Sequence, residues 1–71
     1  MNKQFIAQHK LTAQWFNGRG FAGPAITDAK IVPGFDEGEV ARHFAFIFAV
    51  EPINVRVIRL NDAAITRLAL A

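Results

Sequence analysis

The sequence of 71 residues predicts a small α+β fold, an antiparallel-rich sheet with one helix packed on one face. Three observations predict it: apolar and polar residues nearly alternate from Phe5 to Trp15, a helix-start pattern stands at Asp36, and a second alternation runs through Ile53–Leu60. The expected order is β-β-α-β plus a C-terminal strand or short helix. The length accommodates one small domain, residues 1–71.

The first predicted strand covers Phe5–Trp15, where apolar residues hold most odd positions. The polar residues between them, expected to face solvent, are Gln8, Lys10, Thr12 and Gln14. A helix is the alternative, because Phe5, Gln8 and Thr12 also share helical spacing.

The stretch NGRGFAG, Asn17–Gly23, contains the spacing G-x-G-x-x-G of a dinucleotide-binding loop. A phosphate cradle of this kind needs a helix directly after the glycines. Here Pro24 follows, and then the β-branched segment Ala25–Val32, which predicts a second strand that Pro33-Gly34 ends. Asn17-Gly18 therefore indicates a hairpin turn, since both residues tolerate positive φ.

A helix is predicted from Asp36 to about Val50. Asp36 is a suitable N-cap, and Glu39 stands at the capping-box position. The expected buried stripe is Val40, Phe44, Ile47 and Phe48, and Pro52 ends the helix. A strand over 42–50 is the alternative, because phenylalanine also recurs at every second position there.

The last predicted strand is Ile53–Leu60, and the segment 63–71 is either a helix or a strand. A single helix covers only one face of a sheet, so we expect the other face to be wet. The residues expected there are Gln8, Lys10, Thr12, Gln14, Asp28 or Lys30, Asn54 and Arg56.

The side chains available for catalysis are few. The chain has no Cys, Ser or Tyr, and its only hydroxyls belong to Thr12, Thr27 and Thr66. The two histidines, His9 and His43, have no cysteine to complete a metal site. We therefore expect no catalytic, cofactor or metal site, and a protein that is not an enzyme.

The charge and hydropathy pattern predicts a cytoplasmic protein with no membrane partner. The net charge is only +2, and the N-terminal MNKQFIAQHK lacks the apolar run of a signal peptide. The longest apolar run, Phe44–Val50, is too short to span a bilayer.

The apolar content of 52% is high for so short a chain. One helix on a small sheet cannot hide every apolar side chain of HFAFIFAV, so another macromolecule or a second copy is expected to cover the rest. The sequence thus predicts a protein-binding module, with a homodimer as an alternative source of support. The expected interface residues are Asp36, Glu37, Glu39, Arg42, Phe46 and Phe48.

A small nucleic-acid-binding protein is the second hypothesis. Scattered cations on the sheet, and an aromatic residue beside a cation at the hairpin tip, are typical of surfaces that bind single strands. The residues expected to contact nucleic acid are Lys10, Trp15, Arg19, Lys30 and Arg56.

In size, lack of cysteine and hairpin-plus-helix layout, the chain resembles the small accessory proteins of phages and other mobile elements, including anti-CRISPR inhibitors. The resemblance is one of general layout and involves no shared motif. It implies an inhibitor or accessory protein that occludes or bridges a larger partner.

Overall fold

The computed structural model describes residues 3–61, which form a curled antiparallel sheet and one α-helix. The elements are β1 (Lys3–His9), β2 (Trp15–Phe16), β3 (Phe21–Gly23), the 3₁₀ turn η1 (Ile26–Asp28), β4 (Val32–Gly34), α1 (Glu37–Phe48), the 3₁₀ turn η2 (Pro52–Asn54) and β5 (Val55–Leu60). The predicted α+β class is confirmed. The element predicted over 63–71 lies outside the described residues.

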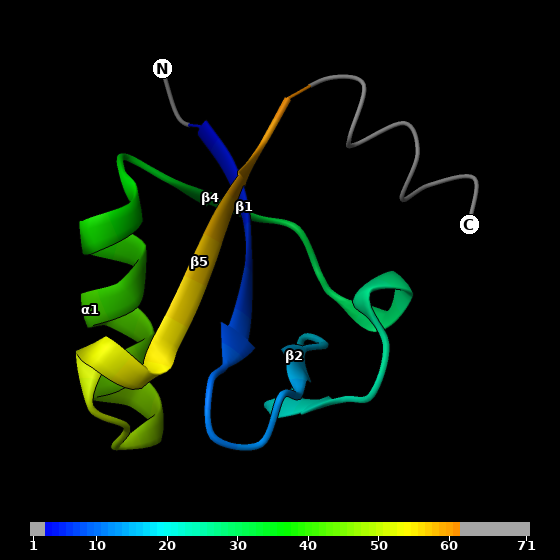
Figure 1. Ribbon diagram of the computed structural model, residues 1–71. Coiled ribbons are helices and arrows are strands. Elements are labelled where there is room, and N and C mark those ends of the chain that lie inside the picture. Colours follow the sequence, from blue (N-terminus) through cyan, green and yellow to red (C-terminus); the bar gives the residue numbers. More distant parts are fainter. Residues whose placement is uncertain (1–2, 62–71) are drawn as a thin grey trace.

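Strand β1 is the centre of the sheet. It pairs antiparallel with β5 from Gln4 to His9, which is the longest ladder. Along its other edge it pairs with β4 at Lys3–Phe5 and with β2 at Gln8. Figure 1 shows β5 crossing in front of β1, with α1 beside them. All these pairings are antiparallel, as expected.

The predicted strand Phe5–Trp15 is wrong in its second half, because the chain turns after His9. Ala13 has a φ of 60°, and its N–H donates to the carbonyl of His9 over 2.8 Å. Side chains support the turn: the Leu11 N–H donates to Nδ1 of His9, and the Gln14 N–H donates to Oγ1 of Thr12. Such local bonds compete with a strand ladder. Trp15 then pairs with Gln8 in a new strand.

The prediction of a hairpin turn at Asn17-Gly18 is confirmed, although the turn joins β2 to β3 and only Gly18 of the two residues has positive φ. Strands β2 and β3 pair antiparallel around residues 17–20, and Gly18 has a φ of +99°. Oδ1 of Asn17 accepts the N–H groups of Arg19 and Gly20, over 3.0 and 3.2 Å. The glycine-rich stretch is therefore a turn held by its own asparagine.

The predicted strand Ala25–Val32 is wrong. Its middle forms η1, where Oδ2 of Asp28 accepts the N–H of Ala25 over 3.0 Å. Only Val32 belongs to β4, which also contains Pro33 and Gly34, the residues expected to end the strand. Pro33 is tolerated because β4 is short and stands at the end of the order β3-β2-β1-β4 of the described strands, where proline's missing N–H costs least.

The predicted helix is confirmed as α1, so residues 42–48 are helical and the alternative of a strand over 42–50 is wrong. Oδ1 of Asp36 accepts the N–H of Glu39 over 2.8 Å, as expected of an N-cap. The carboxylate of Glu39 accepts the N–H of Phe35 rather than that of Asp36, one residue before the usual capping-box position. Ala49, with a φ of 54°, ends the helix in the left-handed conformation.

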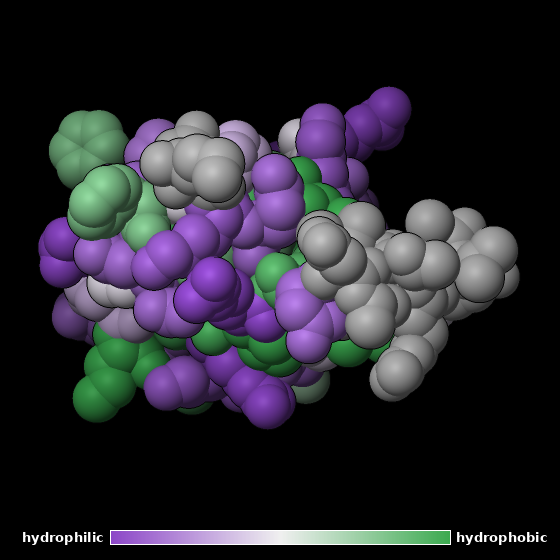
Figure 2. Space-filling view, turned by 90° about the horizontal axis from the view of Figure 1, so that it is seen from above, coloured by the Kyte–Doolittle hydropathy of each residue, from purple (hydrophilic) through white to green (hydrophobic). Residues whose placement is uncertain are grey.

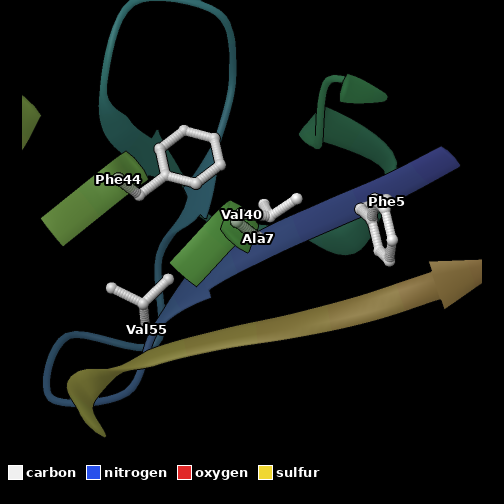
Figure 3. Packing of buried hydrophobic residues seen from close by; sticks show 5 residues of the cluster. All are labelled: Phe5, Ala7, Val40, Phe44 and Val55. Atoms are coloured by element: carbon white, nitrogen blue, oxygen red, sulfur yellow. The ribbon is translucent and has the colours of Figure 1, made fainter. Parts of the chain in front are cut away.

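The larger apolar cluster fills the space between α1 and the sheet. Val40 and Phe44 of the helix pack against Phe5 and Ala7 of β1 and against Val55 of β5 (Figure 3). Both helix residues are 4% exposed, which confirms two members of the predicted stripe. This cluster fixes α1 on one face of the sheet.

The opposite face of the sheet is not wet along its whole length, which corrects the sequence prediction. Ile6 is fully buried there with Trp15 and Leu60 in a second cluster. Ala29 and Ile31 pack on it, because the segment after η1 folds back over this face. Of the residues expected on a wet face, Gln8, Gln14 and Asn54 are half-buried, whereas Lys10, Thr12, Asp28, Lys30 and Arg56 are exposed.

Candidate functional site

Helix α1 exposes a ridge of side chains on the flank beside the β2–β3 hairpin. We define the α1 ridge as Glu39, His43, Phe46 and Ile47, all of which are exposed. The Phe46 side chain is 90% exposed and that of Ile47 is 53% exposed. Figure 2 shows hydrophobic side chains projecting at the left end of the molecule, on the side where α1 lies. The expectation that this helix exposes apolar side chains is confirmed.

A groove of about 580 Å³ runs along the ridge, between α1 and the β2–β3 hairpin and β4. Its floor is apolar and consists of Phe16, Val32, Val40, Phe44 and Phe48, all buried or half-buried. The rings of Phe16 and Phe44 are 4.7 Å apart between centroids, and those of Phe44 and Phe48 are 6.0 Å apart and stacked. The volume is in the range of ligand pockets, and the floor has the composition of an interface core.

The exposed rim of the groove carries its charges. Arg19, at the hairpin turn, and Glu39, in the first turn of α1, both line it, as does His43. The Lys30 side chain lies against Gly18 on the far side of the turn, where a Cβ would be 3.0 Å from Cδ of Lys30. Of these two cations, only Arg19 lines the groove. Within residues 3–61, neither Arg19 nor Glu39 is in an ion pair.

The residues expected at a protein interface lie in three settings. Phe46 and Glu39 belong to the ridge, and Phe48 belongs to the groove floor. Arg42 and Glu37 are exposed on the helix. Asp36 is half-buried, and its carboxylate is bonded to the helix start.

The residues expected to contact nucleic acid are brought together only in part. Trp15 is 8% exposed and packs in the second cluster, so the expectation that it is exposed at the hairpin tip was wrong. The Lys30 side chain lies against Gly18, the residue that precedes Arg19 in the turn. Arg56 lies opposite Gln8 in the β1–β5 ladder, and Lys10 follows β1, so these two are not part of the turn.

Sequence reasoning missed several members of the site. Ile47 was expected in the buried stripe but is exposed, because its angular position on α1 lies toward the groove instead of the sheet. Phe16 and Val32 contribute to the floor from two separate strands, and only the pairing of those strands with β1 brings them to α1. The spacing of Glu39, His43 and Ile47 at every fourth residue was the available signal.

The potential metal ligands of the described residues are dispersed. Among residues 3–61, no three His, Asp or Glu side chains converge as metal ligands. His9 accepts the Leu11 N–H and contacts the Phe21 ring, and His43 lines the groove. In the same part of the chain, every helix falls short of the length and apolarity needed to cross a bilayer.

Comparison with protein-family models, with curated proteins and with solved structures found no match for this chain.

Proposed function

We propose that this chain is a non-enzymatic protein-binding module that contacts a larger protein or protein complex through the α1 ridge and its groove. The observation that carries the proposal is the exposure of Phe46, at 90%, on the helix whose His43 and Ile47 line a groove with a phenylalanine-rich floor. Exposed apolar patches with a polar rim mark contact sites, and aromatic residues are the usual anchors of such sites. The concrete form is a cytoplasmic inhibitor or accessory protein that occludes or bridges its partner.

A capture experiment tests this proposal. The wild-type chain, Phe46→Ser and Leu11→Ser are immobilised, and proteins retained from a lysate of the source cell are quantified by mass spectrometry. Leu11 is the matched control, because it is 76% exposed but lies in the turn after β1, outside the ridge.

A foreign protein retained by the wild type and by Leu11→Ser, but reduced about tenfold with Phe46→Ser, supports the proposal. If all three immobilised chains retain a protein equally, the α1 ridge is not part of the interface. If no protein is retained above the level of a blank support, the proposal of a protein-binding module is contradicted.

Nucleic-acid binding is the second candidate, and it is favoured by the Lys30 side chain lying against Gly18, next to Arg19 in the hairpin turn. Binding of this kind would rest on phosphate contacts, since Trp15 is buried. A gel-shift titration at two salt concentrations tests it with the variant Arg19→Gln. Binding that falls steeply with salt and weakens in the variant supports this function, and absence of binding at low salt excludes it.

A further inference from the structure

The groove is lined by one cation that has no protein partner within the described chain. Arg19 reaches the groove from the hairpin turn, and among residues 3–61 its guanidinium makes neither an ion pair nor a hydrogen bond. A guanidinium carries five N–H donors and no acceptor, arranged as a fork that matches a carboxylate. The group that completes this side of the groove is therefore an acceptor with negative charge.

The acids near the groove are engaged in a different way. Glu39 also lines the groove, and its Oε1 accepts the N–H of Phe35 over 3.1 Å. Oδ1 of Asp36 accepts the N–H of Glu39 over 2.8 Å. Both carboxylates thus have a donor within the chain, and both stand at the positive end of the helix dipole. The groove therefore attracts an anion to Arg19 and repels one from Glu39.

The backbone that carries Arg19 is held in place before any partner binds. Oδ1 of Asn17 accepts the N–H groups of Arg19 and Gly20, over 3.0 and 3.2 Å. Gly20 in turn lies close to the groove floor, because an added Cβ there would be 4.0 Å from Cε1 of Phe48. A cation on such a turn loses little backbone freedom when it binds.

The floor beside this cation is suited to a bulky apolar side chain. The Phe16 ring is 4.7 Å from that of Phe44 and 5.9 Å from that of Phe48, between centroids. Val32 and Val40 extend this apolar lining of a groove of about 580 Å³. An aromatic or branched aliphatic side chain placed there is removed from water and packs against aromatic rings.

Exposed apolar surface continues outside the groove, which decides the class of the occupant. Ile47 lines the groove and is 53% exposed, whereas Phe46 does not line it and is 90% exposed. A small molecule seated in the groove would leave Phe46 in water, but a polypeptide can cover both side chains. A polypeptide also combines a bulky apolar side chain with a carboxylate on a neighbouring residue, as the floor and Arg19 require.

We propose that the groove binds an acidic, apolar segment of a partner protein. A bulky apolar side chain of the segment enters the phenylalanine floor, and a neighbouring Asp or Glu pairs with Arg19. Glu39 adds selectivity, because it disfavours the orientation that would bring the partner's acid to the start of α1. The inference rests on the proposed function, since it names the chemistry of the partner for the same surface.

Selection from a phage-displayed library of random peptides, about twelve residues long, tests this chemistry. The full-length chain is immobilised, and a blank support is the reference. Enriched peptides should combine Asp or Glu with Phe, Trp, Leu or Ile within a few positions of one another. A parallel selection on Arg19→Gln should lose the preference for acidic residues, because the paired cation is gone.

The contribution of the arginine is measured with an enriched peptide, labelled with fluorescein, by fluorescence anisotropy. Arg19→Gln should weaken binding about tenfold. Arg56→Gln is the matched control, because Arg56 is exposed on β5, does not line the groove and gives the same change in net charge. This control should change the dissociation constant by less than about twofold.

A second peptide, in which Asn and Gln replace every Asp and Glu, isolates the charged pair. It should bind the wild-type chain about tenfold more weakly than the acidic peptide does. It should bind the wild type and Arg19→Gln with nearly equal affinity, since the interaction is already absent. Added salt should weaken binding of the acidic peptide to the wild type and have little effect on the second peptide.

Ile47→Ala tests the apolar part of the contact. Because Ile47 lines the groove, this variant should bind the acidic peptide about fivefold more weakly. Leu11→Ala is the control, since Leu11 is also exposed but does not line the groove, and its affinity should equal that of the wild type. Circular dichroism checks that both variants keep the fold.

The inference is overturned if no peptide is enriched above the blank support, or if the enriched peptides lack acidic residues. It is also overturned if Arg19→Gln and Arg56→Gln weaken binding equally, because the attraction is then diffuse. Displacement of the labelled peptide by an equal concentration of a single-stranded oligonucleotide would assign this side of the groove to nucleic acid and would overturn it too.

The proposed function fails by a different result, the absence of a foreign protein whose capture depends on Phe46. A capture that depends on Phe46 but is unchanged in Arg19→Gln contradicts the acidic segment and leaves the protein-binding function in place. The two failures are therefore distinguishable.

Discussion

Phe44 and Phe46 are the same residue type on the same helix, but the first is 4% exposed and the second is 90% exposed. Two residues apart on a strand they would share a face, whereas on a helix they point in nearly opposite directions. Phe44 meets the sheet, and Phe46 meets solvent. The comparison teaches that helical phase, and not hydrophobicity, decides which phenylalanine stabilises the fold and which is available for a partner.

Truncating the two phenylalanines should give the largest contrast. Phe44→Ala leaves a cavity between α1 and the sheet and should cost about 3–5 kcal/mol in free energy of unfolding, enough to unfold most of a domain this small. Phe46→Ala should change it by less than about 0.5 kcal/mol. Urea denaturation followed by circular dichroism, at a concentration where the chain is monomeric, measures both. If the two variants lost similar free energies of unfolding, Phe44 would not be the buried residue and Phe46 the exposed one.

A second contrast compares two glycines on either side of the helix start. At Gly34, in β4, an added Cβ would overlap with Cγ2 of Val40, so Gly34→Ala should cost about 1–3 kcal/mol. At Gly38, on the exposed side of α1, an added Cβ would be 3.3 Å from Nη1 at the flexible end of Arg42 and 3.4 Å from Oδ1 of Asp36. Gly38→Ala should stabilise by roughly 0.5–1 kcal/mol, because glycine is a poor helix former. Urea denaturation measures the free energy of unfolding of both variants. If Gly34→Ala were stabilising, β4 and α1 would not be in close contact.

The smallest effect is expected at the helix N-cap. Asp36→Ala removes the acceptor of the Glu39 N–H and should cost about 1 kcal/mol. Glu37→Ala is the matched control: its carboxylate lies in the same first turn, and its loss should cost only about 0.3 kcal/mol through the helix dipole. Equal losses would mean that charge near the helix end matters and the cap bond does not.

Two patterns whose bonds are local were predicted correctly. The helix start at Asp36 and the hairpin at Asn17 each depend on a side chain that bonds the backbone two or three residues away. The exposure of apolar side chains on α1 was also predictable, because a helix of this composition has more apolar surface than one sheet face can cover.

The errors have two sources. Local side-chain bonds from His9 and Thr12 close a turn inside the single strand that the alternation over Phe5–Trp15 predicted. Trp15 was expected at an exposed tip, yet the pairing of β2 with β1 places it in a cluster with Ile6 and Leu60. No spacing in the sequence reveals this second outcome, since Leu60 belongs to the last strand of the described chain.

The amino-acid sequence by itself determined the α1 start, the turn at Asn17-Gly18 and the surplus of apolar residues around Phe46, because neighbouring residues decide such features. Only the tertiary structure decided which phenylalanines line a groove, why Trp15 is buried, and that Arg19 and Glu39 stand on one rim. The physical reason is that strand pairing and burial join residues far apart in the chain, and their positions depend on how all the elements pack together.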